Sequence, residues 1–280
     1  MKFFKHSSPK IGLALGSGAA RGLAHIGILK ALKEAAIPID MVAGTSMGAI
    51  VGACFAKDGE ITAVEETTLK TNWKQLARLL DPSLRSLKKG LIRGQRIEEL
   101  LYFLIGDATF EDLKIPFAIV ATDINTGQEI IIKEGPVVEA VRASIAIPGI
   151  FIPVTVEGRY LVDGGLTNAV PTDVLRSMGA NFIIAINVLT EPQKRKRAID
   201  HLEKGRTSNI PNIFNILIQS IYIMEYEIIK REILSADIII QPDVSNIEVF
   251  DFHRGEEAIL AGYEAARNAL PELQELIGKQ

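Results

Sequence analysis

The stretch MVAGTSMGAIVGA at residues 41–53 places a Gly-x-Ser-x-Gly pattern between a short apolar run and a run of small apolar residues. This order predicts a buried strand, a sharp turn and a helix. Glycines at Gly44 and Gly48 remove the Cβ atoms that would clash in such a turn, so the hydroxyl of Ser46 is lifted clear of the sheet. The helix directs free N–H groups and partial positive charge at the same place, which favours an oxyanion. We therefore predict a nucleophile at Ser46, with a plain turn residue as the alternative.

A second glycine-rich segment, GSGAARG at residues 16–22, follows an apolar strand candidate and precedes a helical run. A dinucleotide fingerprint would need a third glycine where Arg21 stands, and a Walker A loop would end in Gly-Lys-Ser/Thr, which is absent. The third interpretation is an oxyanion loop, in which backbone N–H groups near Gly18 and Ala19 point at a developing negative oxygen. Arg21 would then brace the loop or add positive potential. Glycines that serve only close strand–helix packing are the alternative.

A hydrolytic serine usually borrows a histidine as its base. None of the histidines of this chain stands in a loop at a strand end with polar neighbours; they are His6, His25, His201 and His253. Asp163 does stand in such a place, because residues 159–162 predict a strand and Gly164-Gly165 allow a sharp bend. The carboxylate of Asp163 is therefore the candidate base, with an Asp-Gly hairpin turn as the alternative.

The three motifs together, in this order and spacing, resemble the patatin-like phospholipases, above all bacterial members and the catalytic domain of neuropathy target esterase. The resemblance extends to ASIAIPGIFIPV at residues 143–154 and to Asn168-Ala169-Val170-Pro171. It covers about residues 10–190, with a weaker similarity to about residue 245. It implies a three-layer α/β/α patatin-like fold, with a mainly parallel sheet, an antiparallel part and helices on both faces.

The resemblance also implies a Ser-Asp dyad, with Ser46 as nucleophile and Asp163 as proton acceptor. It implies an oxyanion hole at Gly18 and Ala19 with Arg21 beside it, although Ser17 and Ala19 stand where the family usually has glycine. The expected activity is hydrolysis of a phospholipid or lysophospholipid through an acyl-enzyme. A generic carboxylesterase or acyltransferase, or a non-catalytic regulatory protein on the same fold, are the alternatives. Because an ordinary carboxylate is a weak base towards an alcohol, the site of Asp163 should be partly desolvated.

Composition agrees with an enzyme of this kind. With 280 residues, of which 48% are hydrophobic, the chain can bury a large core, and we expect one domain over residues 1–280. The net charge of −3 argues against a nucleic-acid partner. The run at residues 194–197, KRKR, is expected to be a solvated loop, with a binding patch as the alternative.

The expected location is the cytoplasm, and no metal or cofactor is expected. A single cysteine, Cys54, excludes an intrachain disulfide and fits a reducing compartment. No Cys/His cluster has metal-ligand spacing. The segment Met1–Pro9 has no apolar stretch of the kind that a signal peptide needs.

The hydrophobic pattern predicts alternating strands and helices. Predicted strands lie near 10–15, 41–43, 117–122, 129–133, 155–162, 182–188 and 237–241. Predicted helices lie near 22–36, 47–57, 60–70, 94–105, 136–146, 172–178, 211–234 and 255–269. Asp123-Ile124-Asn125-Thr126-Gly127 is a turn signal, which predicts an antiparallel pair beside a mainly parallel sheet.

Two segments bear on the substrate. Residues 58–110 are either a cap over the serine or a surface insertion, and their basic-apolar part at 84–93 suits peripheral contact with anionic lipid at the inner membrane surface. The segment 211–234 predicts a helix that is apolar on nearly every side in its first half. Its uncharged stretch is too short to span a membrane. We expect a core helix there, with a face for a homo-oligomer or an acyl-chain groove as alternatives.

Overall fold

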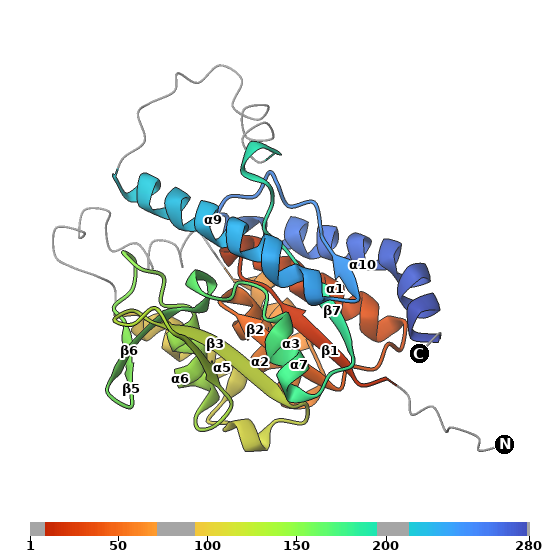
Figure 1. Cartoon of the computed structure of the whole chain (residues 1–280), viewed down its shortest axis with the longest axis horizontal. Helices are drawn as coiled ribbons and strands as arrows, with labels where there is room; N and C mark the ends of the chain where they lie inside the picture. The colour runs from red at the N-terminus through yellow and green to blue at the C-terminus, as the bar shows by residue number, and fades with distance from the viewer. Residues whose placement is uncertain (1–8, 72–92, 195–212, 279–280) are drawn as a thin grey trace.

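The computed structural model describes residues 9–71, 93–194 and 213–278 (Figure 1). Expectations for other residues lie outside these ranges. They concern the basic-apolar part at 84–93 except Arg93, the basic run at 194–197 except Lys194, and the histidines His6 and His201.

In the described ranges the strands form one mixed sheet in the order β5-β6-β3-β2-β1-β7-β8, with β4 beside β3. Their bounds are Ile11–Leu15 (β1), Met41–Thr45 (β2), Phe117–Asp123 (β3), Glu129–Ile132 (β4), Val154–Val156 (β5), Arg159–Asp163 (β6), Phe182–Ile186 (β7) and Ile238–Ile240 (β8). The pairs among β3, β2, β1, β7 and β8 are parallel. The pairs of β3 with β4 and β6, and of β5 with β6, are antiparallel. The predicted mainly parallel sheet with an antiparallel part is confirmed.

Helices cover both faces of this sheet (Figure 1). Their bounds are Ala24–Glu34 (α1), Met47–Asp58 (α2), Thr62–Lys70 (α3), Gln95–Ile105 (α5), Val137–Ser144 (α6), Thr172–Met178 (α7), Ile213–Glu232 (α9) and Gly255–Gly278 (α10). Helices α1, α2, α5, α6 and α10 share one core with the sheet, and α7 and α9 share the other. The central strands are buried on both faces, as parallel strands between helical layers must be. The predicted three layers are confirmed.

Three elements differ from their prediction. The single strand predicted at 155–162 is a hairpin, β5 and β6, because Glu157 and Gly158 both adopt positive φ, +49° and +78°, and turn the chain back. The helix predicted at 22–36 is preceded by a 3₁₀ turn, Ala19–Leu23 (η1), so part of the glycine loop is itself helical. Helix α10 continues through Pro271 to Gly278 rather than ending at residue 269.

The register of the sheet brings the ends of β2 and β6 to one level. Thr45, the last residue of β2, is paired with Val120 of β3. Strand β3 continues past this point, and its next residue, Ala121, is paired on the other side with Asp163, the last residue of the antiparallel β6. Ser46, one residue beyond Thr45, therefore lies level with Asp163, with Ala121 of β3 between their two strands.

None of the helices within residues 9–71, 93–194 and 213–278 is both long and apolar enough to cross a membrane. This includes α9, whose sequence predicts that it does not span a membrane. Helix α9 instead packs Tyr222 and Ile229 into the core between it and the sheet.

Candidate active site

Ser46 lies at a strained turn between β2 and α2. Its backbone has φ +55° and ψ −119°, a conformation that a residue with a side chain rarely adopts. The residues two positions before and after it must be glycine. A Cβ on Gly44 would lie 2.5 Å from the carbonyl oxygen of Gly48, and a Cβ on Gly48 would lie 2.1 Å from that of Leu15. The N–H of Ser46 donates to Oγ of Ser144 at 2.9 Å, which holds the turn from below.

Asp163 faces this serine. Oγ of Ser46 donates to Oδ2 of Asp163 at 2.7 Å, and the N–H of Gly165 donates to the other carboxylate oxygen at 2.9 Å. The backbone N–H of Asp163 is itself held by the carbonyl of Ala146 at 3.1 Å. The sequence predicted that Ser46 and Asp163 meet, and the structure brings them together.

Burial changes the acidity of Asp163. The residues Ser46 and Asp163 are 5% and 3% exposed. Loss of water raises the pKa of Asp163 to about 6, although the hydrogen bonds from Gly165 and Ser46 act in the opposite direction. A carboxyl with a pKa near neutrality accepts a proton more readily than an ordinary aspartate, so the desolvated site expected from the sequence is present.

The glycine loop leads from the end of β1 to the side of Ser46. Its first amides are used within the protein, because the N–H of Gly16 donates to Ile186 and that of Ser17 to Ala169. The amides of Gly18 and Ala19 donate to no acceptor among the described residues, and both residues line the cavity that Ser46 faces. Ala19 adopts a positive φ of +47°. Two free N–H groups beside a serine hydroxyl are the arrangement that an oxyanion hole requires.

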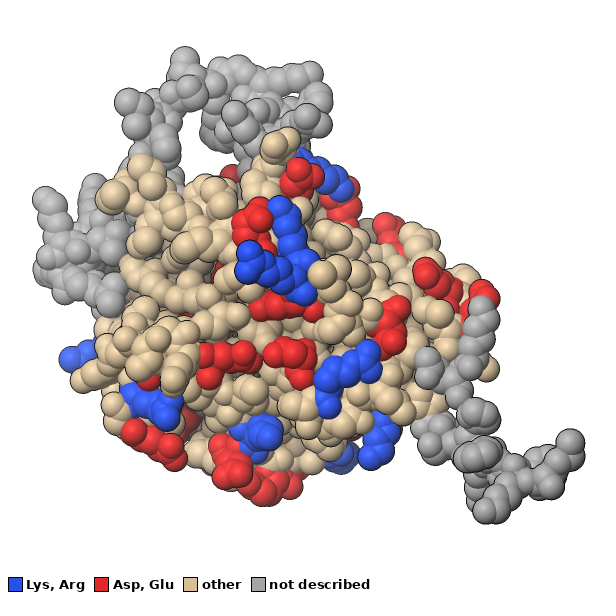
Figure 2. Space-filling model, viewed as in Figure 1, with Lys and Arg blue, Asp and Glu red and all other residues tan. Residues whose placement is uncertain are grey.

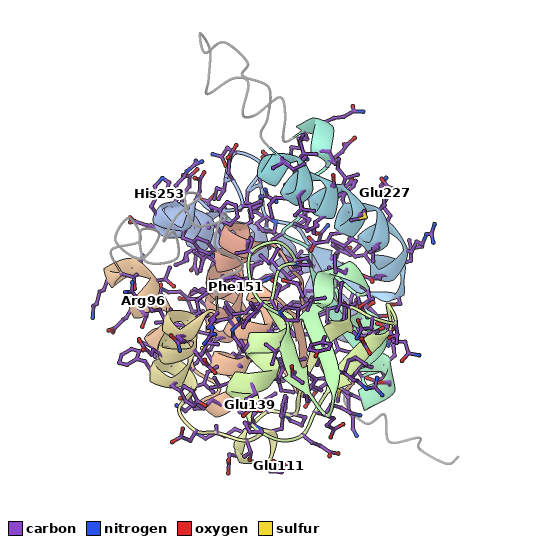
Figure 3. The ribbon with its side chains drawn as sticks, turned by 90° about the vertical axis from the view of Figure 1, so that its left-hand side faces the viewer. Arg96, Glu111, Glu139, Phe151, Glu227 and His253 are labelled. Carbon is purple, nitrogen blue, oxygen red and sulfur yellow. The ribbon has the colours of Figure 1, made fainter. Side chains whose placement is uncertain are left out.

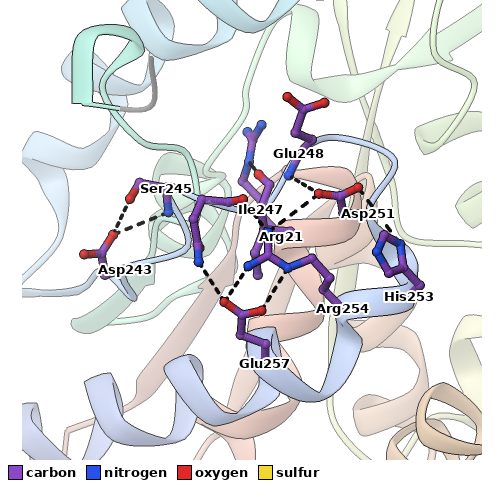
Figure 4. A network of polar contacts seen from close by, with 10 residues as sticks. Arg21, Asp243, Ser245, Ile247, Glu248, Asp251, His253, Arg254 and Glu257 are labelled. Atoms are coloured by element: carbon purple, nitrogen blue, oxygen red, sulfur yellow. Dashed lines mark hydrogen bonds and ion pairs between the residues drawn. The ribbon is translucent and has the colours of Figure 1, made fainter. Parts of the chain in front are cut away.

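Arg21 is fully buried and ties the glycine loop to distant parts of the chain. Its Nε donates to the carbonyl of Ile247 at 2.7 Å, as Figure 4 shows, and its guanidinium lies 4.6 Å from the ring centre of Tyr222 in α9. The N–H of Ala20 donates to the carbonyl of Val249 in the same distant segment. Of the two roles considered for Arg21, these contacts favour bracing.

The segment that receives Arg21 is ordered by its own polar network (Figure 4). Arg254 donates to the carboxylate of Glu257 through two nitrogens, and Asp251 accepts from the N–H of Glu248. Asp243 accepts from Ser245. The loop next to Ser46 is therefore held by a structured C-terminal segment.

The histidines in the described ranges do not reach Ser46. His25 is completely buried, and its Nε2 lies 2.8 Å from the carbonyl oxygen of Gly16. Burial lowers the pKa of His25 to about 4, so the ring is neutral at pH 7 and serves as a donor to the loop. His253 is half exposed beside Asp251, and Figure 3 shows it at the edge of the fold, apart from Phe151 near the middle.

A cavity of about 40 Å³ lies against Ser46 and Asp163. Helix α9 forms one wall through Ile218, Ile221 and Tyr222, and Ile147 adds apolar surface from the predicted motif at 143–154. The described parts of 58–110 contribute no residue to the lining of this cavity. A cap was one of the two roles considered for this segment, and the part that the structure describes does not cover the cavity. Of the roles considered for 211–234, the core helix is confirmed for the inner side of α9, which also lines the site.

The outer side of α9 is apolar where the helix begins. Figure 2 shows the charged side chains gathered away from this end, which is mostly tan in the upper left of the view. Among the side chains of α9 that the structure describes, the exposed apolar ones are Ile213, Ile216, Leu217, Ile223 and Met224. An apolar surface therefore adjoins the wall of the cavity.

Sequence reasoning missed one acid of the site. Glu225 of α9 lines the same cavity as Asp163, and Oγ of Ser17 donates to its Oε2 at 3.2 Å. One partner, Ser17 of the glycine loop, is 208 residues away in the chain, and the other, Gly165 in the turn after β6, is also distant in sequence. No local pattern marks it, because a glutamate in the second half of a helix is ordinary.

Comparison with known proteins gives the site its context. The family model described as patatin-like phospholipase matches residues 13–176, which include the glycine loop, Ser46 and Asp163. The chain belongs to the patatin-like phospholipase family. The predicted resemblance is confirmed.

The relatives with similar sequences include an NTE family protein and a neuropathy target esterase. An uncharacterized NTE family protein of Mycobacterium tuberculosis is 40% identical over 182 residues, which are 65% of this chain and 50% of the relative. Neuropathy target esterase sws of Drosophila melanogaster is 39% identical over 183 residues, 64% of this chain and 13% of the relative. The chain thus spans half or less of the length of these curated relatives.

Among solved structures, the crystal structure of VipD from Legionella pneumophila has a similar fold. The TM-score is 0.53 at 14% identity, over 95% of this chain and 67% of that chain. This likeness supports the patatin-like fold alone.

Proposed function

We propose that the protein is a serine acyl-ester hydrolase in which Ser46 and Asp163 form the catalytic dyad, and that its substrate is a phospholipid or lysophospholipid. The observation that carries the proposal is the 2.7 Å hydrogen bond between Ser46 Oγ and Asp163 Oδ2 at the strained elbow. Family membership supports ester hydrolysis, and a relative named as an esterase supports a similar reaction.

In the proposed reaction Asp163 accepts the proton of Ser46 as the hydroxyl oxygen attacks the ester carbonyl. The negative oxygen that forms is stabilised by the free amides of Gly18 and Ala19. Protonated Asp163 returns the proton to the departing alcohol, which leaves an acyl-enzyme on Ser46. Water, with Asp163 again as base, then releases the fatty acid.

The charges of the site fit this sequence of steps. A base with a pKa of about 6 is ionised at pH 7 and is still a better proton acceptor than an ordinary aspartate. One amide of an oxyanion hole typically contributes about 10²–10³ in kcat, so the pair at Gly18 and Ala19 would supply much of the acceleration. Arg21 holds these amides in place through Ile247 rather than acting on the substrate.

The apolar surroundings favour an acyl chain as the group recognised. Ile147, Ile218 and Ile221 line the cavity, and Phe151 packs in a cluster with Ile147 and Ile218. A cavity of about 40 Å³ has room for about three water molecules, so as it stands it can hold only a small part of a long chain. We propose that α9, which forms one wall, shifts when such a chain binds.

The wider setting is part of the same proposal. Residues 1–280 would form one domain, because α10 packs closely on α1: a Cβ on Gly27 would lie 1.9 Å from the carbonyl oxygen of Ile259. The buried thiol of Cys54 suits a cytoplasmic enzyme. The apolar start of α9 suits peripheral contact with the inner membrane surface, and flotation with liposomes tests this; a homo-oligomer through the same face would instead show as a dimer in solution.

Hydrolysis of lysophosphatidylcholine, with release of fatty acid as the readout, tests the activity. We expect Ser46→Ala and Asp163→Asn each to abolish release while circular dichroism shows a folded protein. If only short soluble esters are cleaved, or if an added alcohol takes the acyl group in preference to water, the enzyme is a general esterase or an acyltransferase. If a folded Ser46→Ala variant retains the activity, the proposal is wrong.

A further inference from the structure

Glu225 stands where α9 crosses the glycine loop and the turn after β6. One of its carboxyl oxygens, Oε2, accepts a hydrogen bond from Ser17 at 3.2 Å. The other, Oε1, lies so close over Gly165 that a Cβ at that position would be 2.3 Å away. Gly165 is the residue whose N–H holds Asp163. Glu225 thus touches both segments that position the dyad and the two free amides.

The groups that face Glu225 carry both signs of charge. Asp163 at the end of β6 and Glu232 on the same helix repel a second negative charge, and burial disfavours it further. The hydrogen bond from Ser17 and the positive charge of Arg21 act in the opposite direction. Burial is the largest of these effects, and it raises the pKa of Glu225 to about 8.

Asp163 and Glu225 therefore titrate as a pair, with apparent pKa values of about 6 and about 8. Between these values the cavity holds one carboxylate and one neutral carboxyl. Above them it holds two negative charges next to the place where an oxyanion must form.

On the basis of the proposed function, we propose that Glu225 is a positioning residue of this site: as a neutral carboxyl it holds Ser17 of the glycine loop and leaves Asp163 as the single anion at the cavity. With Oε2 accepting from Ser17, the proton of Glu225 would reside on Oε1, over Gly165. Ionisation of Glu225 repels the negative transition state. Activity should consequently fall in alkaline solution because of Glu225, a residue that takes no part in bond breaking.

The test is to measure kcat/KM as a function of pH for a short, water-soluble ester. Hydrolysis is recorded by pH-stat titration, and the rate with Ser46→Ala is subtracted as the uncatalysed background. Glu225→Gln keeps an uncharged side chain of the same length. Glu227→Gln is the matched control, since Glu227 lies on the same helix but at the periphery, where it pairs with Lys230 (Figure 3).

We expect the wild type and Glu227→Gln to lose about tenfold in kcat/KM between pH 7 and pH 9, the change in the protonated fraction of a group with a pKa of about 8. Glu225→Gln should lose less than about twofold over the same interval. Ser17→Ala should shift the alkaline loss to higher pH, because the hydrogen bond that lowers the pKa of Glu225 is removed. A purely structural role predicts no change in the shape of these profiles.

A second measurement does not depend on activity. In protein with ¹³C-labelled glutamate, the δ-carbon signal that is absent from Glu225→Gln should titrate near pH 8. Titration below pH 6, or an alkaline loss that persists in Glu225→Gln, overturns the inference. If the wild type is inactive but this carboxyl still titrates near pH 8, the proposed hydrolase function is refuted. The inference that Glu225 is a neutral carboxyl at pH 7 is then still supported.

Discussion

Replacement of His25 by glutamine tests whether catalysis uses a Ser-Asp dyad or a triad that includes a histidine. His25 is the second residue of α1, and its ring forms a 2.8 Å hydrogen bond with the carbonyl oxygen of Gly16. Glutamine offers an N–H donor of similar reach, so the loop keeps its partner. Because the glutamine side chain differs in shape from the buried imidazole, we expect His25→Gln to lower the free energy of unfolding by about 1–3 kcal/mol. We expect kcat to fall by less than about tenfold, whereas a triad that loses its histidine loses about 10⁶.

The pKa of His25 gives the same variant a second signature. The ring is neutral in the folded protein down to about pH 4, but it gains a proton near pH 6.5 when the chain unfolds. The unfolded state therefore binds more protons in this window, and the wild type loses stability as the pH falls from 6.5 towards 4. The loss attributable to His25 amounts to about 2 kcal/mol between pH 7 and pH 5. The difference in unfolding free energy between wild type and His25→Gln should shrink by that amount.

Urea denaturation at the two pH values and initial rates on a soluble ester measure both effects. A folded His25→Gln variant whose kcat falls more than a thousandfold would show that an imidazole takes part in the chemistry. In that case the dyad is wrong, whatever the distance between Ser46 and Asp163.

Three further outcomes follow from the geometry. Gly48→Ala should not give a folded protein, because its Cβ would lie 2.1 Å from a backbone oxygen of Leu15. The control Gly278→Ala has open space around the new Cβ, so its melting curve in circular dichroism should match that of the wild type. The melting temperature of the wild type should fall between pH 6.5 and pH 8, since Glu225 keeps in the folded state a proton that the unfolded chain releases, and it should fall less in Glu225→Gln; an equal fall in both contradicts the raised pKa. Hydrogen exchange in α9 should rise when the inactive serine variant meets lysophospholipid micelles, because the cavity of about 40 Å³ cannot admit an acyl chain as it stands; unchanged protection contradicts this.

Site residues could be predicted from the sequence where a local sequence pattern also has a clear chemical role. The elbow at Ser46 is readable because the clash at Gly44 and Gly48 leaves glycine as the only choice. Asp163 is readable because it ends a strand and precedes two glycines. Their meeting could be inferred only through the family resemblance, because the level of β6 along β3 is set by pairing between distant segments.

Two features of the structure were not predicted from the sequence, and each has a physical reason. The hairpin of β5 and β6 turns at Glu157, which takes a positive φ although glutamate is not a usual turn residue, so the two strands were predicted as one. Glu225 was missed because its environment comes from Ser17 and Asp163, far away in sequence. Burial and coupled charge appear only once the chain is folded.

The most direct test of the central claim is the rate and position of labelling by a fluorophosphonate probe, with the adduct located by mass spectrometry. The probe reports an activated serine and requires no knowledge of the substrate. The account predicts an adduct on Ser46 in the wild type and labelling at least a hundredfold slower in folded Asp163→Asn. An adduct on another residue, or equally fast labelling of Ser46 without the Asp163 carboxylate, would contradict it.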